Sequence, residues 1–384
     1  MENMPGRAWV EINLDSIAHN LREIRGRLGN GVRINGVIKA DGYGHGAVMT
    51  AGVLCDNGID MLSVATLDEA VQLRKQKIKV PILVLGYTEV GRLREIIRND
   101  IIVSVFDIEL ARKLSDEAKT NNKRIKVHIK IDTGMNRIGF PWDYEADIIE
   151  AFNLKGLEIC GTFTHFSTAD EEDGEYTKVQ YVRFANILER LRNEDLEPGV
   201  CHADNSGGAL LHVDKALDMV RTGLLLYGLY PSEYSRLASR MELEPAMIFK
   251  AKIIKVKEVE KGMPVSYGNK YITAGKTKIA TIACGYADGY SRVLSGKAQV
   301  IINGRKAPII GNICMDMCMA DISGIDTPVK AGDMAILFNG EITAGDVADI
   351  SGTINYEILC RIGMRVPRVY KQGDKVVKVS NYLL

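Results

Sequence analysis

The 384-residue sequence lacks the features that would place it in a membrane, outside the cell or on a nucleic acid. It has 49 basic and 49 acidic side chains, so there is no net charge to attract a nucleic acid or an anionic membrane surface. No uninterrupted apolar run approaches the roughly 20 residues that span a bilayer. No apolar run follows Met1-Glu2-Asn3-Met4-Pro5, so we expect no signal peptide and a cytoplasmic protein.

The sequence also lacks cysteines paired in the manner of zinc sites. Its seven cysteines are scattered, and Cys314 and Cys318 lie four residues apart without a second cysteine or histidine pair nearby. The odd number of cysteines and the moderate chain length favour a reducing compartment. We therefore expect no metal site.

What the sequence does contain is an alternation of apolar runs with helical patterns. Eight runs rich in β-branched residues are too uniformly apolar for a sheet with one wet face, and they suit strands buried on both faces. These runs are 34–40, 61–66, 81–86, 101–106, 125–131, 158–166, 200–204 and 219–227, of which the run around Cys201 is the weakest. Helical patterns separate them, which predicts an α/β fold with an N-terminal (β/α)8 TIM barrel over residues 12–241.

The pattern changes near Pro231. From about residue 242 onward, short strands are separated by glycine-containing junctions, and Asn303-Gly304 and Asn339-Gly340 are typical of hairpins. We expect two helices in this part, near 344–350 and 355–362. The prediction is a C-terminal all-β domain of residues 242–384, joined by residues 1–11 through a short strand around Trp9.

Catalytic groups of a TIM barrel lie at the carboxyl ends of its strands. That rule selects Lys39, Leu85, Arg137, His165, Asn205, Ser206 and Arg221. A lysine that is desolvated in a site has a lowered pKa and can attack a carbonyl to form a Schiff base. Each residue also has an ordinary alternative role, such as a surface lysine, a satisfied buried histidine, a helix N-cap or a salt bridge. Their coincidence at one end of the barrel favours a common site.

The segment Val37-Ile38-Lys39-Ala40-Asp41-Gly42-Tyr43-Gly44-His45-Gly46 closely resembles the cofactor-lysine segment of the alanine racemases, which are pyridoxal-phosphate enzymes with a barrel fold. The resemblance extends from Trp9 to Arg368, with further matches at 130–139, 265–268, 285–290, 314–316 and 354–357. It implies a racemase that interconverts L- and D-alanine and supplies D-alanine for peptidoglycan. A serine or broad-specificity amino-acid racemase of the same fold is the alternative.

The resemblance also implies roles for the catalytic residues. Lys39 binds pyridoxal phosphate covalently and is one of two bases, and Tyr267 is the second base on the opposite face of the substrate. His165 and Arg221 continue a relay from Tyr267. Because a guanidinium is not easily deprotonated, Arg221 keeps the pyridine nitrogen unprotonated, which favours racemisation over decarboxylation. The remaining cofactor-binding residues implied by the resemblance are Tyr43, Leu85, Arg137, Asn205, Ser206, Gly223, Leu224 and Tyr356.

The substrate-binding residues that the resemblance implies are Arg137, Cys314, Met315, Asp316 and Tyr286. Lys130 matches a lysine that is often carbamylated in relatives, which would create an anion that orients Arg137. Asn312 departs from the pattern, since many relatives have an arginine at this place in the access corridor. Tyr267 is expected to reach the active site of a partner subunit, which predicts a homodimer with shared sites.

Two other classes of protein share parts of this pattern. A decarboxylase with the same barrel would place a carboxylate, and not Arg221, near the pyridine nitrogen. A non-catalytic protein that binds pyridoxal phosphate would keep Lys39 but would lack the β domain and Tyr267. The combination of Arg221 and Tyr267 therefore favours the racemase.

Overall fold

The computed structural model describes residues 6–384, and the chain forms two compact units. The barrel unit consists of residues 17–42 and 47–244, and the β unit comprises the chain up to Ser16, the turn 43–46 and residues 245–384. The boundaries between the units, after Ser16 and after Glu244, lie a few residues further along the chain than the boundaries expected from the sequence. The turn 43–46 groups with the β unit because the backbone of Gly44 accepts a hydrogen bond from Arg368 Nε at 3.1 Å.

The barrel unit contains the eight strands expected from the apolar runs. They are β2 (Arg33–Val37), β3 (Met61–Val64), β4 (Ile82–Val84), β5 (Ile102–Val105), β6 (Ile125–Asp132), β8 (Leu157–Phe163), β9 (Val200–His202) and β10 (Met219–Thr222). Their order is β10-β2-β3-β4-β5-β6-β8-β9. Two backbone hydrogen bonds outside the regular strand pairing join the chain at β9 to the chain at β10, the strands at the two ends of this order. The N–H groups of Asp218 and Arg221 donate to the carbonyls of Cys201 and Asp204, each at 3.1 Å. The predicted (β/α)8 barrel is confirmed.

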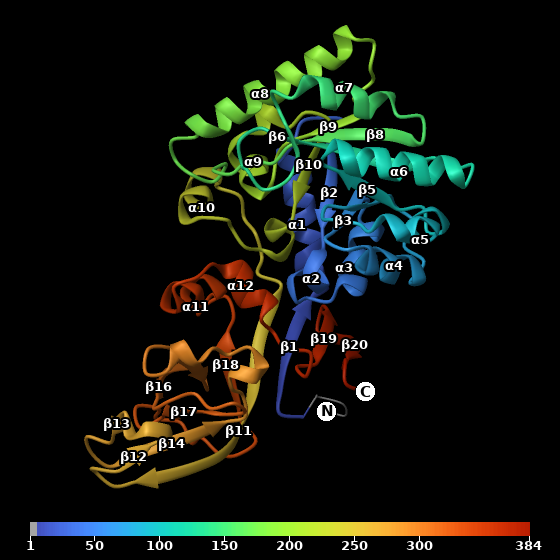
Figure 1. Cartoon of the computed structure of the whole chain (residues 1–384). Helices are drawn as coiled ribbons and strands as arrows, with labels where there is room; N and C mark the ends of the chain where they lie inside the picture. The colour runs from blue at the N-terminus through green and yellow to red at the C-terminus, as the bar shows by residue number, and fades with distance from the viewer. Residues whose placement is uncertain (1–5) are drawn as a thin grey trace. The chain divides into compact units, whose positions relative to one another are not determined.

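Helices between the strands cover the outside of the barrel (Figure 1). After α1 (Leu14–Arg27) they are α3 (Ala47–Asp56), α4 (Leu67–Lys75), α5 (Leu93–Arg98), α6 (Ile108–Thr120), α7 (Glu145–Asn153), α8 (Glu175–Asn193) and α9 (Ser206–Leu211). Side-chain caps fix several starts: Thr66 accepts the N–H of Glu69 at 3.3 Å, and Asp107 accepts that of Leu110 at 2.7 Å. A further helix, α10 (Glu233–Ser239), was not expected from the sequence. Within the described residues, no helix is both long and apolar enough to cross a membrane.

Several barrel strands end before the predicted runs do, and two of these ends lie next to predicted site residues. Strand β2 ends at Val37, and Lys39 begins a left-handed turn, α2 (Lys39–Tyr43), in which Ala40, Asp41 and Gly42 have φ of 53°, 54° and 62°. Strand β10 ends at Thr222 and is followed by a 3₁₀ turn, η3 (Leu224–Tyr227). The two runs were predicted to continue as strand past these residues, which was wrong because a buried apolar run has the same sequence pattern in a strand and in a buried turn.

The β unit is built on one long sheet. Its strands are β1 (Ala8–Asn13), β11 (Met247–Val259), β14 (Thr277–Ile282), β15 (Gln299–Ile302), β16 (Arg305–Ile310), β17 (Cys318–Asp321), β18 (Met334–Phe338), β19 (Arg368–Gln372) and β20 (Lys375–Ser380). The order is β14-β17-β16-β15-β18-β11-β1-β19-β20, and β14 also pairs with β11, so the first six strands close into a ring. Strand β1 pairs antiparallel with β11 and parallel with β19, which confirms that the early strand joins this domain.

The two Asn-Gly signals of the β unit differ in outcome: the hairpin expected at Asn339-Gly340 is wrong, because the chain there passes from β18 into a helix of residues 344–351. Asn303 and Gly304, with φ of 49° and 73°, form the predicted tight hairpin between β15 and β16. A smaller pair, β12 (Pro264–Val265) and β13 (Tyr271–Ile272), encloses the turn η4 (Tyr267–Asn269). Helices α11 (Ala344–Ser351) and α12 (Asn355–Cys360) lie where two helices were predicted.

Candidate active site

Lys39 stands at the first position of the left-handed turn that follows β2, and its side chain is half-buried. The N–H of Ala40 donates to one carboxylate oxygen of Glu69 at 2.6 Å, and the other oxygen accepts the N–H groups of Ala65 and Thr66 at 2.7 and 3.1 Å. One carboxylate thus ties the turn of the lysine to the loop after β3. Consecutive residues other than glycine with positive φ are strained, and such strain persists where the surroundings hold it, often at functional sites.

Arg221, on β10, is the best-anchored side chain at this end of the barrel and is only 3% exposed. Its guanidinium donates to the carbonyls of Thr164 and Ala203, both at 2.8 Å. It also contacts Nδ1 of His165 at 3.0 Å and Nδ1 of His202 at 2.8 Å. Burial lowers the pKa of Arg221 to about 10, so the side chain stays charged at neutral pH.

These contacts fix the protonation of three histidines. An arginine can only donate, so Nδ1 of His165 and of His202 must accept, and each ring then carries its proton on Nε2. His202 Nε2 lies 2.9 Å from Nδ1 of His128 and donates to it. Burial, and next the charge of Arg221, lower the pKa of all three histidines. At neutral pH His165 is therefore neutral and carries an N–H on the side of its ring away from Arg221.

The start of α9 provides hydrogen-bond donors for an anion. Asn205 caps the helix by accepting the N–H of Gly208 at 3.1 Å, and Ser206 Oγ accepts the N–H of Gly223 at 3.2 Å. Throughout residues 6–384, no acceptor contacts the N–H groups of Ser206, Gly207 and Leu224. Unpaired N–H groups at the starts of two short helical turns suit a phosphate group, so the donor set fits a phosphorylated cofactor.

Lys130 and Arg137 lie at the end of β6 and in the loop that follows it. Lys130 is 4% exposed, and its ammonium donates to the carbonyl of Ile131 at 2.8 Å. Burial lowers the pKa of Lys130 to about 7, so a large share of this amine is neutral at physiological pH. Arg137 has an exposed side chain, and its backbone N–H donates to Asp132 Oδ2 at 3.2 Å.

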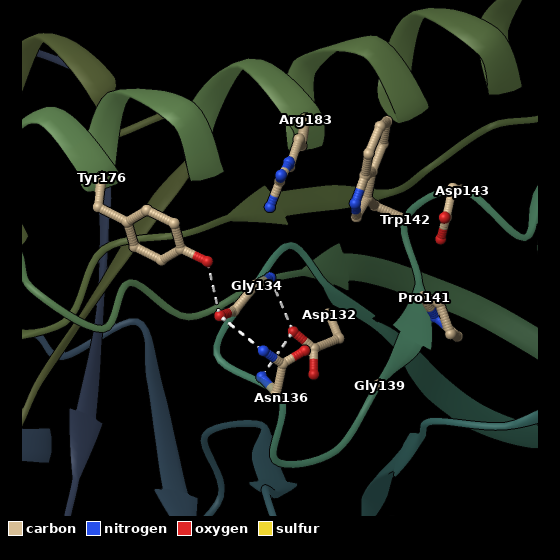
Figure 2. A pocket seen from close by; sticks show the side chains of 9 residues that line it. All are labelled: Asp132, Gly134, Asn136, Gly139, Pro141, Trp142, Asp143, Tyr176 and Arg183. Carbon is tan, nitrogen blue, oxygen red and sulfur yellow. Dashed lines mark hydrogen bonds between the residues drawn. The ribbon is translucent and has the colours of Figure 1, made fainter.

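The loop after β6 is held from its outer side by α8. Figure 2 shows Tyr176 and Arg183 extending from this helix toward the loop at Gly134, beside a cavity of about 420 Å³. Gly134 has φ of 134°, which other residues rarely adopt, and a Cβ atom there would lie 2.3 Å from the hydroxyl of Tyr176, so a larger residue would strain the loop and displace that side chain. Leu85, the last of the barrel residues predicted for the site, is half-buried after β4 and packs against an apolar cluster that includes Leu83.

In the β unit, Tyr267 lies at the turn of the β12–β13 hairpin with 72% of its side chain exposed. Asn312 Nδ2 donates to the carbonyl of Tyr267 at 2.6 Å. The hydroxyl of Ser266, a residue with φ of 65°, donates to the carbonyl of Asn312, also at 2.6 Å. Asn312, which departs from the expected pattern, therefore fixes the conformation of the turn that carries Tyr267.

A buried carboxylate organises the segment 314–316. Asp288, 1% exposed, forms ion pairs with Arg7 and, at 2.8 Å, with Arg365. Arg365 also pairs with Asp316 at 2.7 Å and donates to the carbonyl of Met315 at 3.3 Å. The N–H of Tyr286 donates to the carbonyl of Cys314 at 3.1 Å. The side chain of Met315 itself is 53% exposed. The backbone of Met315 is thus held rigidly while its side chain faces outward.

The predicted site residues divide between the two units. In the barrel unit, the positive charges of Arg221, Lys130, Arg137 and Lys39 all help to lower the pKa of His165 after burial, so these five groups lie near one another. The residues of the β unit are Tyr43, Tyr267, Tyr286, Cys314, Met315, Asp316 and Tyr356. Among them, the rings of Tyr43 and Tyr356 lie 6.0 Å apart.

The sequence-based prediction missed two residues that the structure connects to this group. His202, the last residue of β9, meets the rule that selected the others, but the weak pattern of this strand concealed it. Gln180, on α8, contacts the backbone of His165. In the sequence, Gln180 is recognisable only as a polar residue that shares one helix face with the apolar residues Phe184 and Ile187, which are buried.

Comparison with known proteins agrees with this geometry. The family models for the alanine racemase N-terminal and C-terminal domains match residues 12–231 and 246–370. The chain is 46% identical to the alanine racemase of Clostridium perfringens over 381 residues, 98% of each chain. Its structure resembles that of the Clostridium difficile 630 alanine racemase, with a TM-score of 0.95, 43% identity and complete coverage of both chains.

A more distant structure is also similar over nearly its whole length. The alanine racemase of Bartonella henselae, solved with covalently bound pyridoxal phosphate, has a TM-score of 0.87 and 27% identity, covering 96% of this chain and 100% of its own. Both domain models and the full-length relatives therefore agree with the barrel and the β unit. The chain belongs to the alanine racemase family of enzymes.

Proposed function

We propose that this chain interconverts L- and D-alanine with pyridoxal phosphate bound covalently to Lys39. Two observations support the cofactor: the Bartonella relative was solved with covalently bound pyridoxal phosphate, and the donors at the start of α9 suit its phosphate. When bound, the cofactor supplies an electron sink that makes the α-proton of an amino acid acidic. The rest of the chemistry is the movement of that proton by the side chains of the protein.

The residues of the barrel would hold the cofactor at three places. The N–H groups of Ser206, Gly207 and Leu224, with Asn205 and Gly223 as their support, would bind the phosphate. Tyr43 and Tyr356, which the family resemblance also assigns to the cofactor, belong to the β unit. Arg221 would face the pyridine nitrogen without giving up its own proton. Arg137 would contact the phenolic oxygen, and Leu85 would provide an apolar wall.

The observation that carries the proposed mechanism is the contact between Arg221 and His165 Nδ1 at 3.0 Å. It leaves His165 neutral with its proton on Nε2, ready to donate to an oxygen. We propose that this oxygen is the phenolic oxygen of Tyr267 of the partner subunit. A donated hydrogen bond, backed by the charge of Arg221, stabilises the phenolate that accepts the α-proton from one face. Lys39, whose amine becomes free when the amine of the substrate takes its place, would accept or return the proton on the other face.

The β unit would contribute to this site from a partner. Tyr267 is 72% exposed on a turn braced by Asn312, as expected for a side chain that completes its contacts on a second molecule. The rigid backbone at Met315, with Cys314, Asp316 and Tyr286 around it, would bind the substrate carboxylate together with Arg137. We therefore propose a homodimer with two shared sites, no nucleic-acid partner, and a role in supplying D-alanine for peptidoglycan. The seven free thiols suit the reducing cytoplasm.

Lys130 is proposed to carry a carbamate. Only a neutral amine adds to carbon dioxide, and burial lowers the pKa of Lys130 to about 7. Carbamylation replaces a buried cation among Arg221 and Arg137 with an anion, which turns repulsion into attraction. The carbamate would then orient Arg137 toward the cofactor.

Solvent-deuterium exchange tests the two-base assignment. We expect Lys39→Ala to abolish racemisation in both directions. Tyr267→Phe should slow deuterium uptake from one enantiomer far more than from the other, because only one face loses its base. Tyr271→Phe, in the same hairpin, is the matched control and should leave both uptake rates unchanged. Equal and undiminished uptake from both enantiomers by Tyr267→Phe would exclude the assignment.

A further inference from the structure

One face of α8 braces the loops at the carboxyl ends of two barrel strands. Tyr176, Gln180 and Arg183 are spaced four and three residues apart, so they lie in one row on this helix. Tyr176 donates to the carbonyl of Gly134 at 2.9 Å, and Arg183 donates to the carbonyl of Thr133, also at 2.9 Å. Figure 2 shows both side chains reaching from α8 toward this loop. The outer two residues of the row therefore contact the loop after β6.

Gln180, between them, contacts both loops and is completely buried. Its amide nitrogen donates to the carbonyl of His165 at 3.1 Å and to the hydroxyl of Thr133 at 3.4 Å. Its amide oxygen accepts the N–H and the hydroxyl of Ser167 at 2.9 and 3.1 Å. A backbone carbonyl only accepts and a backbone N–H only donates, so the amide can satisfy both in one orientation alone.

A second bond joins the same loops. The hydroxyl of Thr133, in the loop after β6, lies 2.7 Å from that of Thr164, in the loop after β8. Gln180, Thr133 and Thr164 thus form a buried link between the segment that carries Arg137 and the segment that carries His165. A buried amide is costly unless its hydrogen bonds are made, and every bond of this one goes to the two loops.

We propose that Gln180 is a positioning residue that couples the loop of Arg137 to the loop of His165, so that the arginine and the histidine keep one fixed arrangement. The proposal rests on the function proposed above, in which Arg137 contacts cofactor and substrate and His165 supports the tyrosine base. A leucine would fill the same space on α8 and keep its apolar packing. The amide group of Gln180 therefore stabilises the two loops, and the packing of α8 does not depend on it.

Hydrogen–deuterium exchange of the cofactor-loaded enzyme tests the coupling directly. In Gln180→Leu, peptides that cover 133–139 and 164–168 should both exchange about tenfold faster, because both loops lose their common support. Tyr176→Phe, which removes a bond to the first loop only, should affect 133–139 alone. Ser115→Ala removes a buried bond to Gly156, ahead of β8 at the opposite end of the barrel, and should affect neither loop. Unchanged exchange in Gln180→Leu, or a change in one loop only, would overturn the proposal.

A readout of proton transfer separates positioning from a general loss of stability. Partial unfolding would slow deuterium uptake from L- and D-alanine by the same factor. Loss of the His165 position should slow the same enantiomer that Tyr267→Phe slows. If Gln180→Leu does not fold, Thr133→Val breaks the same link with an isosteric side chain and should change the exchange of both loops. If the wild-type enzyme does not racemise alanine, the proposed function fails, whereas the exchange experiment still decides whether Gln180 couples the loops.

Discussion

Asp204 offers a quantitative test of the electrostatics of the barrel. Its carboxylate is fully buried behind β9, and neither oxygen has a hydrogen-bond partner among the described residues. Burial raises the pKa of Asp204 from 3.8 to about 7, although the charge of Arg221 acts in the opposite direction. Well below pH 3.8 this group is protonated in both the folded and the unfolded chain. As the pH rises toward 7 the unfolded chain ionises first, so the folded state loses stability progressively.

The size of the effect follows from the two pKa values. Each tenfold difference in proton affinity corresponds to about 1.4 kcal/mol, so the wild type should lose about 4 kcal/mol between pH 4 and pH 8 through this group. Asp204→Asn keeps the shape and removes the ionisation. For a chain of 384 residues, 4 kcal/mol corresponds to a shift of about 5 °C in Tm.

The assay compares the thermal unfolding of the apoenzyme of wild type and variant at pH 5 and pH 8. Between these two pH values the same pKa difference amounts to about 2.6 kcal/mol, so the advantage of Asp204→Asn over the wild type should be about 3 °C larger at pH 8 than at pH 5. Asp143→Asn, which changes an exposed carboxylate, is the control and should show no such difference. If the relative Tm of Asp204→Asn is the same at both pH values, the buried carboxylate does not titrate as the structure implies.

Three further predictions concern the charged groups of the site. Arg221→Lys keeps the charge but cannot make four planar contacts, so racemisation should fall at least about tenfold while the protein still folds; an unchanged rate would contradict the relay. Asp288→Asn removes the shared charged partner of Arg7 and Arg365, so it should lower the free energy of unfolding by about 2 kcal/mol. It should also raise the KM for alanine, because Arg365 holds the backbone of Met315. An unchanged KM would show that this segment does not bind substrate. Wild-type protein in labelled bicarbonate should show a carbamate carbon signal that grows as pH rises through about 7 and is missing in Lys130→Ala; no signal at any pH would exclude carbamylation.

The architecture was predictable because its signals are local. Apolar runs buried on both faces, separated by helical patterns, determine a parallel barrel. Asn303-Gly304 forms the hairpin that it predicts, whereas Asn339-Gly340 leads from β18 into α11 and forms none. Strand β20 was missed because its residues are almost all exposed and polar positions interrupt its valines. The left-handed turn at Lys39 was missed because Ala40 and Asp41 do not favour positive φ, which tertiary contacts such as that from Glu69 impose.

The site was predictable to the extent that its residues follow strand ends. Lys39, Arg137, His165 and Arg221 all stand there, and the structure places their charges close enough to act on His165. The supporting residues could not be found in this way. Gln180 lies in the middle of a helix, and its function depends on which loops the helix packs against. The sequence pattern shows only that a polar residue is buried, and the partner of that residue is a property of the fold.

The most direct test of the account is racemisation by purified protein with added pyridoxal phosphate, using L-alanine, L-serine and L-lysine side by side and Lys39→Ala as the inactive control. We expect rapid conversion of L-alanine, much slower conversion of the other two, and no conversion by the variant. Comparable rates on serine or lysine would make the enzyme a racemase of broader specificity. Absence of racemisation of all three, with the cofactor absorbance still present, would exclude the proposed racemase activity.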